Sequence, residues 1–160
     1  MAGGPVGYVH PVPTILVALS DGADARRVAT FVNTFFRADD YEILGINISA
    51  EPAPVLSPEA GFGVMYPWGL HRDLATEEAE RRERSERHAE QVVAASGLQG
   101  DEAIGRCGDP AEMIMVAATE RDVDLIVVGA SHGGILNHIF SPSVEKALSH
   151  RADRPLLVVP

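Results

Sequence analysis

The sequence predicts a single α/β domain built on an open, five-stranded parallel sheet with helices on both faces. Short apolar runs alternate with longer segments in which apolar residues recur every three or four positions, as strands alternate with crossover helices. The apolar runs are nearly continuous, which is typical of strands that are covered on both faces. A length of 160 residues with 46% hydrophobic content suits one domain with a substantial core.

The first half of the chain contains two of the predicted strands. Residues 14–19 (TILVAL) form the first apolar run, and the polar turn at residues 20–22 (SDG) ends it. Residues 41–48 (YEILGINI) form the second strand. Between them, a helix is predicted from one apolar face that consists of Val28, Ala29, Val32, Phe35 and Phe36.

A long helix is predicted over residues 74–96. Its acidic and basic residues include four pairs spaced four apart in the favourable order, namely Glu77–Arg81, Glu78–Arg82, Glu80–Arg84 and Glu83–Arg87. Its apolar stripe is thin and consists of Ala75, Ala79, Ala89, Val92 and Val93. We therefore expect the outer side of this helix to be solvated.

The second half supplies the remaining elements. Strands are predicted at residues 103–107, 125–128 and 156–159. A helix opens after the first of them, where Asp109 suits the N-cap, Pro110 the first helical position and Glu112 the capping box. The inward residues of this helix and of the last one, 143–150, are Met113, Ile114, Ala117, Ala118, Val144, Ala147 and Leu148. Five strands alternating with four helices imply right-handed crossovers and a parallel sheet.

Two loops are candidates for a binding site. In such sheets, ligands bind beyond the carboxyl ends of the strands, where the strand order reverses. The loop after the first strand carries Asp21, whose carboxylate suits a ribose or an adenine amino group, or alternatively a turn or helix cap. The loop after the fourth strand begins at Gly129 and runs to Ser143, an arrangement of strand, glycines and helix start that favours phosphate.

Three segments resemble the universal stress protein family: 14–29 (TILVALSDGADARRVA), 108–134 (GDPAEMIMVAATERDVDLIVVGASHGG) and 143–160 (SVEKALSHRADRPLLVVP). The resemblance implies the strand order 3-2-1-4-5, dimerisation through the last strand and, in one subgroup, ATP held by a Gly-x2-Gly-x9-Gly-Ser/Thr loop. It assigns residues 14–160 to the family's domain and leaves residues 1–13 as an N-terminal extension. Residues 51–73 form an irregular insertion rich in proline and glycine.

Only part of the family's glycine loop is present. Gly129 and Ser143 match its first and last positions, but the other two glycines fall on His132 and Pro142. The His132 ring takes space that a close phosphate needs, and Pro142 lacks an N–H donor. A protonated His132 or His138 is an alternative donor to phosphate. The predicted nucleotide-binding residues are Leu19, Ser20, Asp21, Gly22, Gly129, His132, Gly133, Ser143 and Val144.

Composition excludes several function classes. A net charge of -10 argues against general binding to nucleic acid or to anionic membranes. No apolar stretch approaches a bilayer span and the N-terminus lacks signal-peptide features, so we expect a cytoplasmic protein. The single Cys107 fits a reducing compartment. The histidines lack metal-ligand spacing, so we expect no metal site, and Mg²⁺ only together with bound ATP.

Two further segments bear on partners. The insertion contains Val64, Met65, Tyr66 and Trp68, an apolar cluster that suits the ligand crevice, a second subunit or its own domain's surface. Residues 155–160 (PLLVVP) predict an apolar edge strand that needs covering. Pairing with the same strand of a second copy about a two-fold axis covers both edges, which predicts a homodimer.

Three functions are compatible with these features. The favoured one is a non-catalytic, dimeric stress-response module that senses or carries an adenine nucleotide such as ATP or AMP. The second is an interaction-only stress protein with unidentified protein partners, in which His132 and Pro142 mark a lost nucleotide site. The third is an enzyme, because residues 20–25 (SDGADA) are similar to the Ser-Gly-Gly-x-Asp-Ser loop of ATP pyrophosphatases except at the second and last positions. No nucleophile and base stand at a recognisable spacing, so no catalytic residue is predicted.

Overall fold

The computed structural model describes residues 12–49, 74–130 and 142–160. Its elements are β1 (Thr14–Ala18), α1 (Ala23–Phe35), β2 (Glu42–Ser49), α2 (Leu74–Ser96), β3 (Glu102–Cys107), α3 (Pro110–Glu120), β4 (Leu125–Gly129), α4 (Pro142–Arg151) and β5 (Leu156–Val159). All strand pairs are parallel and the sheet order is β3-β2-β1-β4-β5. The predicted fold class and strand order are therefore confirmed. The 51–73 insertion and its apolar cluster lie outside the described residues.

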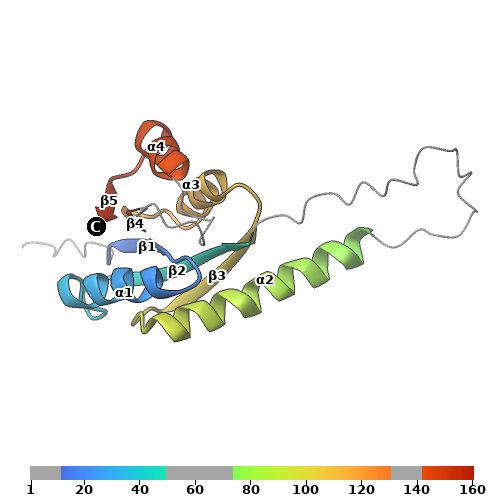
Figure 1. Cartoon of the computed structure of the whole chain (residues 1–160), viewed down its shortest axis with the longest axis horizontal. Helices are drawn as coiled ribbons and strands as arrows, with labels where there is room; N and C mark the ends of the chain where they lie inside the picture. Colours follow the sequence, from blue (N-terminus) through green and yellow to red (C-terminus); the bar gives the residue numbers. More distant parts are fainter. Residues whose placement is uncertain (1–11, 50–73, 131–141) are drawn as a thin grey trace, which may run out of the picture.

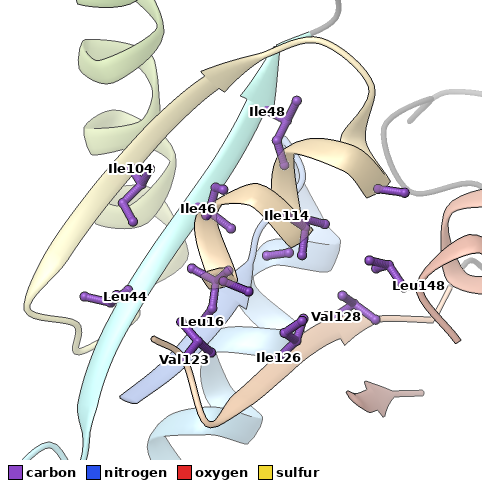
Figure 2. Close-up of a cluster of buried hydrophobic side chains, with 14 of the residues drawn as sticks. Leu16, Leu44, Ile46, Ile48, Ile104, Ile114, Val123, Ile126, Val128 and Leu148 are labelled. Carbon is purple, nitrogen blue, oxygen red and sulfur yellow. The ribbon is translucent and has the colours of Figure 1, made fainter. Parts of the chain in front are cut away.

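The sheet separates two hydrophobic cores. Figure 1 shows α1 and α2 on one side of the sheet and α3 and α4 on the other. In β1, Leu16 and Ala18 belong to the core under α3 and α4, whereas Ile15 and Val17 belong to the core under α1 and α2. Figure 2 shows the first of these cores, where Ile114 of α3 lies among strand side chains. Burial on both faces explains why the strand sequences are continuously apolar.

Only the second half of α2 packs on the sheet. Ala89 and Val92 are buried as predicted, but Ala79 is exposed. The reason is visible in Figure 1, where the amino-terminal turns of α2 extend beyond the strands. Ser85 is also buried, and its hydroxyl donates to the Arg106 carbonyl at 2.9 Å. A short polar side chain thus takes part in the packing of α2 against β3.

The charged surface of α2 differs in detail from the sequence pattern. The predicted pair of Glu83 and Arg87 forms, with 3.6 Å between the carboxylate and the guanidinium. Arg82 instead pairs with Glu86 at 3.0 Å, so the expected partner Glu78 is displaced. These side chains are largely exposed, and such i,i+4 pairs differ little in energy. Spacing alone therefore does not decide which partner an arginine selects.

The predicted buried face of α1 needs one correction. Val28, Ala29 and Val32 are buried, whereas Phe35 is 66% exposed. Phe35 is the last residue of the helix and lies on its flank, where the sheet no longer covers it. Phe36 already has extended backbone and packs edge-on against Tyr41, with ring centroids 5.4 Å apart.

The start of α3 confirms its predicted cap. The Asp109 carboxylate accepts from the Glu112 N–H at 2.9 Å, and Pro110 occupies the first turn. We expect Asp109→Ala to lower the free energy of unfolding by about 1 kcal/mol, because this N–H loses its acceptor. Urea unfolding followed by circular dichroism measures the effect. Asp39→Ala, which breaks an exposed pair with Arg37, is the control and should change stability by less than about 0.5 kcal/mol.

Candidate functional site

The two predicted loops leave the sheet side by side. β1 and β4 are neighbours, with Val17 opposite Val127, and they connect to helices on opposite faces of the sheet. The strand order reverses between them, which makes their carboxyl ends the switch point of this sheet. Backbone bonds continue the sheet past both strands, from Leu19 N–H to the Ile46 carbonyl at 2.9 Å and from Ala130 N–H to the Val159 carbonyl at 2.7 Å.

Asp21 joins the loop after β1 to two other elements. Its Oδ1 accepts from the side-chain amide of Asn47 on β2 at 3.2 Å and lies 3.1 Å from Nε2 of His88 on α2. Its Oδ2 has no hydrogen-bond partner within the described ranges. Half of the Asp21 side chain, 51%, is exposed. The loop thus carries a carboxylate that is held in place and still has one oxygen available to a ligand.

Asn47, on the neighbouring strand β2, fixes the conformation of this loop. It is 1% exposed, and its Nδ2 donates to the Leu19 carbonyl at 2.9 Å as well as to Asp21. Both neighbours are acceptors, so the amide group must present its nitrogen to them. Its oxygen is buried, and no described residue donates to it. A buried acceptor without a donor lowers the stability of the folded protein. The amide keeps this orientation because it allows both bonds from Nδ2, which are therefore structurally important.

The start of α1 follows directly. Gly22 is the N-cap with φ 108°, a left-handed conformation that favours glycine, and no side chain caps the first turn. The alternative role of Asp21 as a helix cap is therefore not observed. A surface hollow of about 560 Å³ opens between this helix start and α2, lined by Asp21, His88 and Arg26 among others. Ser20, by contrast, is buried at 6% exposure.

The other side of the α1 start faces the end of β4. A Cβ at Gly129 would lie 3.0 Å from the Val28 side chain, so glycine permits the close approach of α1. Nη2 of Arg27 donates to the Ala130 carbonyl at 3.4 Å, and Nη1 pairs with Asp24 at 3.1 Å. The Nε of Arg27 is buried with no partner in the part of the chain described. A cation therefore lies at the first residue of the loop that follows β4.

The amino-terminus of α4 completes the described part of the site. The helix begins at Pro142, so the proline that replaces a glycine of the family's loop starts the helix. Ser143 is exposed. The Val144 side chain is buried in the core under α3 and α4, which leaves its backbone as the part able to meet a ligand. His132 and Gly133 lie outside the described residues, so their predicted roles stay predictions.

Three residues of this region were missed by the sequence reasoning. Asn47 is a polar residue between two isoleucines in the buried part of β2, and a polar side chain predicted on a buried strand could have indicated it. Arg27 is the second arginine after the first loop and sits one turn into α1. His88 has no local indication, because its contact with Asp21 joins residues 67 positions apart.

The described residues give no indication of metal chemistry or of membrane insertion. Within them, no group of three or more metal-ligating side chains comes together. In the same ranges, no helix combines the length and apolar character needed to cross a bilayer.

Comparisons with known proteins agree with this architecture. Residues 12–160 match the model of the Universal stress protein family. A protein described as "Universal stress protein in QAH/OAS sulfhydrylase 3'region" from Thermus aquaticus is 29% identical over 148 residues, 91% of this chain and 97% of its own.

Two solved structures share the fold. A universal stress protein in complex with cAMP has TM-score 0.54 and 19% identity, and the match covers 94% of this chain and 98% of that one. The Archaeoglobus fulgidus universal stress protein in complex with dAMP has TM-score 0.50 and 19% identity, with the same coverage of 94% and 98%. The family match spans nearly the whole chain, and the sheet order fits it. The chain belongs to the universal stress protein family.

Proposed function

We propose that this chain is a non-catalytic, dimeric stress-response module that binds an adenine nucleotide at the carboxyl ends of β1 and β4. The observation that carries the proposal is the position of Arg27, which brings a guanidinium to Ala130, beside Gly129 and the loop toward α4. Guanidinium groups bind phosphate strongly and directionally. Pro142 lacks an N–H donor for phosphate, and the His132 ring takes space that a close phosphate needs. The Arg27 guanidinium compensates for part of this loss.

The base and ribose are proposed to meet the loop after β1. No described residue hydrogen-bonds to Oδ2 of Asp21, and a carboxylate oxygen suits an adenine amino group or a ribose hydroxyl. Asn47 and His88 hold this carboxylate in place, which reduces the entropy lost on binding. The cAMP and dAMP complexes of structurally similar proteins support an adenine nucleotide as the ligand class.

The interaction-only alternative is favoured by one observation. α4 begins at Pro142, so its first turn has one N–H fewer to offer an anion. In this alternative, the Asp21–His88 contact is a purely structural link between the first loop and α2. The two functions differ in a simple way, because only the first requires a bound nucleotide.

The proposal is tested by looking for that nucleotide. The purified protein is denatured, and the released small molecules are identified by chromatography and mass spectrometry. The nucleotide-free protein is then titrated calorimetrically with ATP and AMP, with GTP as the control for the base. We expect adenine nucleotide in the extract and saturable heat for ATP. An empty extract together with no heat at millimolar ATP would overturn the nucleotide-binding proposal.

Arg27→Met separates phosphate from base recognition. We expect ATP affinity to fall about tenfold, the effect of losing one charge-assisted contact of about 1.4 kcal/mol, and AMP affinity to fall less. Arg37→Met is the matched control, since the exposed Arg37 lies just beyond the other end of α1, where it pairs with Asp39. Calorimetry on both variants provides the measurement. Equal losses for both variants would show that the effect is only a change in net charge.

A homodimer through β5 is part of the proposal, and the contrast between the two sheet edges supports it. The β3 edge carries charged residues that are paired on the same molecule, Arg106 with Glu120 at 2.8 Å and Glu102 with Arg121. Such charges protect an edge strand from pairing. β5 consists of Leu156, Leu157, Val158 and Val159, with no charge. Its outer edge is therefore the one suited to a second copy.

A further inference from the structure

One flank of α1 carries an aromatic stripe, which we define as Phe31 and Phe35. The two rings lie one helical turn apart, with centroids 4.6 Å apart and planes tilted by 39°. Phe31 is partly buried against the core under α1, and Phe35 is 66% exposed, the most exposed large hydrophobic side chain among the described residues. Phe35 therefore presents most of its ring to the surface, beside a second ring that is only partly buried.

The stripe is on the flank of α1 that faces β4 and β5. Arg27, one turn before Phe31, contacts the residues at the end of β4. The opposite flank is identified by Asn33, whose side chain donates to the Gly97 carbonyl just after α2 at 2.8 Å. Arg27, Phe31 and Phe35 are spaced four residues apart and so lie on the same flank of α1. Because α1 runs antiparallel to β4, the two phenylalanines lie closer than Arg27 to the amino end of that strand. The stripe therefore borders the sheet surface beyond α1.

That neighbouring sheet surface is apolar and has little cover. β5 pairs with β4 so that Leu157 lies opposite Val127 and Val159 opposite Gly129. Leu157 and Val159 belong to the core on the α1 side, and Leu157 is only partly buried. On this face, α2 lies over β2 and β3 and α1 over β1 and β4, so among the described elements none lies over β5.

We infer that the aromatic stripe is covered by the same stripe of a second copy, above the two joined β5 strands. This inference rests on the proposed dimer through β5. A two-fold axis normal to the sheet would place both α1 helices on one face, with the two β5 strands between them. Strand spacing of about 4.8 Å separates the two helix axes by roughly 15–20 Å. Helices about 10 Å across leave a groove between them that phenyl rings from both copies fill.

A second copy suits this surface better than a different partner for two reasons. The stripe and the unpaired edge of β5 border the same corner of the molecule, so one self-complementary contact covers both. The two joined β5 strands of the proposed dimer also need apolar cover on this face, since none of the described helices lies over β5 there. Phe31 and Phe35 from both copies, four phenyl rings in all, provide that cover. Aromatic residues are frequent in the centres of interfaces.

The experiment measures the dimer dissociation constant of the full chain by sedimentation equilibrium. We expect Phe35→Ser to weaken the dimer by 10- to 100-fold, the range of one interface aromatic. Val116→Ser is the matched control, because Val116 is also exposed, at 38%, but lies on α3 on the other face. We expect it to leave the dissociation constant within twofold of the parent. Circular dichroism confirms that both variants are folded.

A third variant separates this inference from the dimer itself. The carbonyls of Pro155 and Val159 point toward β4, where they accept from the N–H groups of Ile126 and Ala130. Backbone groups alternate in direction along a strand, so the N–H of Val158 points to the outer edge. Val158→Pro removes that donor without breaking a bond to β4, so we expect a folded monomer. If Val158→Pro is monomeric while Phe35→Ser dimerises like the parent, the stripe inference is overturned and the β5 dimer stands. If the parent chain is monomeric at high micromolar concentration, both are overturned.

Discussion

Replacing Gly105 by alanine is expected to lower the free energy of unfolding by about 3 kcal/mol or more, because a methyl group has no space there. A Cβ at Gly105 would lie 2.2 Å from the Ser85 carbonyl oxygen and 2.4 Å from the Glu86 nitrogen. These are backbone atoms of α2, so the helix as a whole would have to move away from β3. Urea unfolding by circular dichroism gives the loss, and the slope with denaturant should stay unchanged.

Gly45→Ala is the control for this variant. Gly45 is also in a strand under α2, but a Cβ there would first meet the tip of the Val93 side chain, at 2.6 Å. A side chain can move to a neighbouring rotamer at a cost of about 1 kcal/mol, whereas a helix backbone cannot. We therefore expect Gly45→Ala to be the milder of the two. Equal losses would mean that helix α2 is not held closely against β3.

The second large effect is expected for Asn47→Asp, a change of one atom at nearly constant shape. The new carboxylate oxygen would face the Leu19 carbonyl and Asp21, two acceptors that Nδ2 now binds at 2.9 and 3.2 Å. A buried, unpaired charge beside two acceptors costs about 3 kcal/mol or more at neutral pH. Burial and the neighbouring Asp21 charge raise the pKa of the new carboxyl above the value of about 3.9 found in unfolded chains.

The sign of the pH dependence follows from that raised pKa. The folded variant binds its proton more tightly than the unfolded chain, so acid stabilises the folded form. We expect the difference from the parent to shrink as pH is lowered toward 4 and to grow again as pH rises through the folded pKa. Thermal unfolding of both proteins at several pH values measures this. A pH-independent difference would contradict the assigned orientation of the Asn47 amide.

Asn33→Asp is the matched control for the chemistry of the substitution. Asn33 also bridges two backbone groups, donating to the Gly97 carbonyl at 2.8 Å and accepting from the Gln99 N–H at 3.0 Å. It is only half-buried, and both of its bonds are exposed, so solvent stabilises the new charge. We expect a loss of less than about 1.5 kcal/mol, the value of one such bond, with little dependence on pH.

The sequence predicted the fold well because its strands and caps are local features. The positions of the strands, the extent of α2 and the Asp109 cap were obtained from runs, periodicities and turn residues, whereas the sheet order came from the family resemblance. Errors arose where tertiary position decides exposure. Phe35 has the spacing of a buried residue but lies at the flank and end of α1, and Ala79 belongs to turns of α2 that extend past the sheet.

The candidate site was predicted only in outline. Both loops were located from Asp21 and Gly129, which come at the ends of their strands, and the structure places those two strands side by side. The residues that organise them are remote in sequence, since Asn47 reaches Asp21 across 26 positions and Arg27 reaches Ala130 across 103. Contacts of this kind depend on the completed sheet, so no local pattern indicates them.

The central claim, that an adenine nucleotide binds where β1 and β4 end, is tested most directly by nuclear magnetic resonance of the ¹⁵N-labelled protein during titration with ATP. We expect saturable shifts at the backbone amides of Gly22, Gly129 and Ser143, around the switch point. Gly97 and Gly100 follow α2 and lie near the amino ends of the strands, away from the switch point. Their amide shifts should therefore stay unchanged. The absence of shifts at millimolar ATP, or shifts confined to the Gly97–Gly100 edge, would contradict the claim.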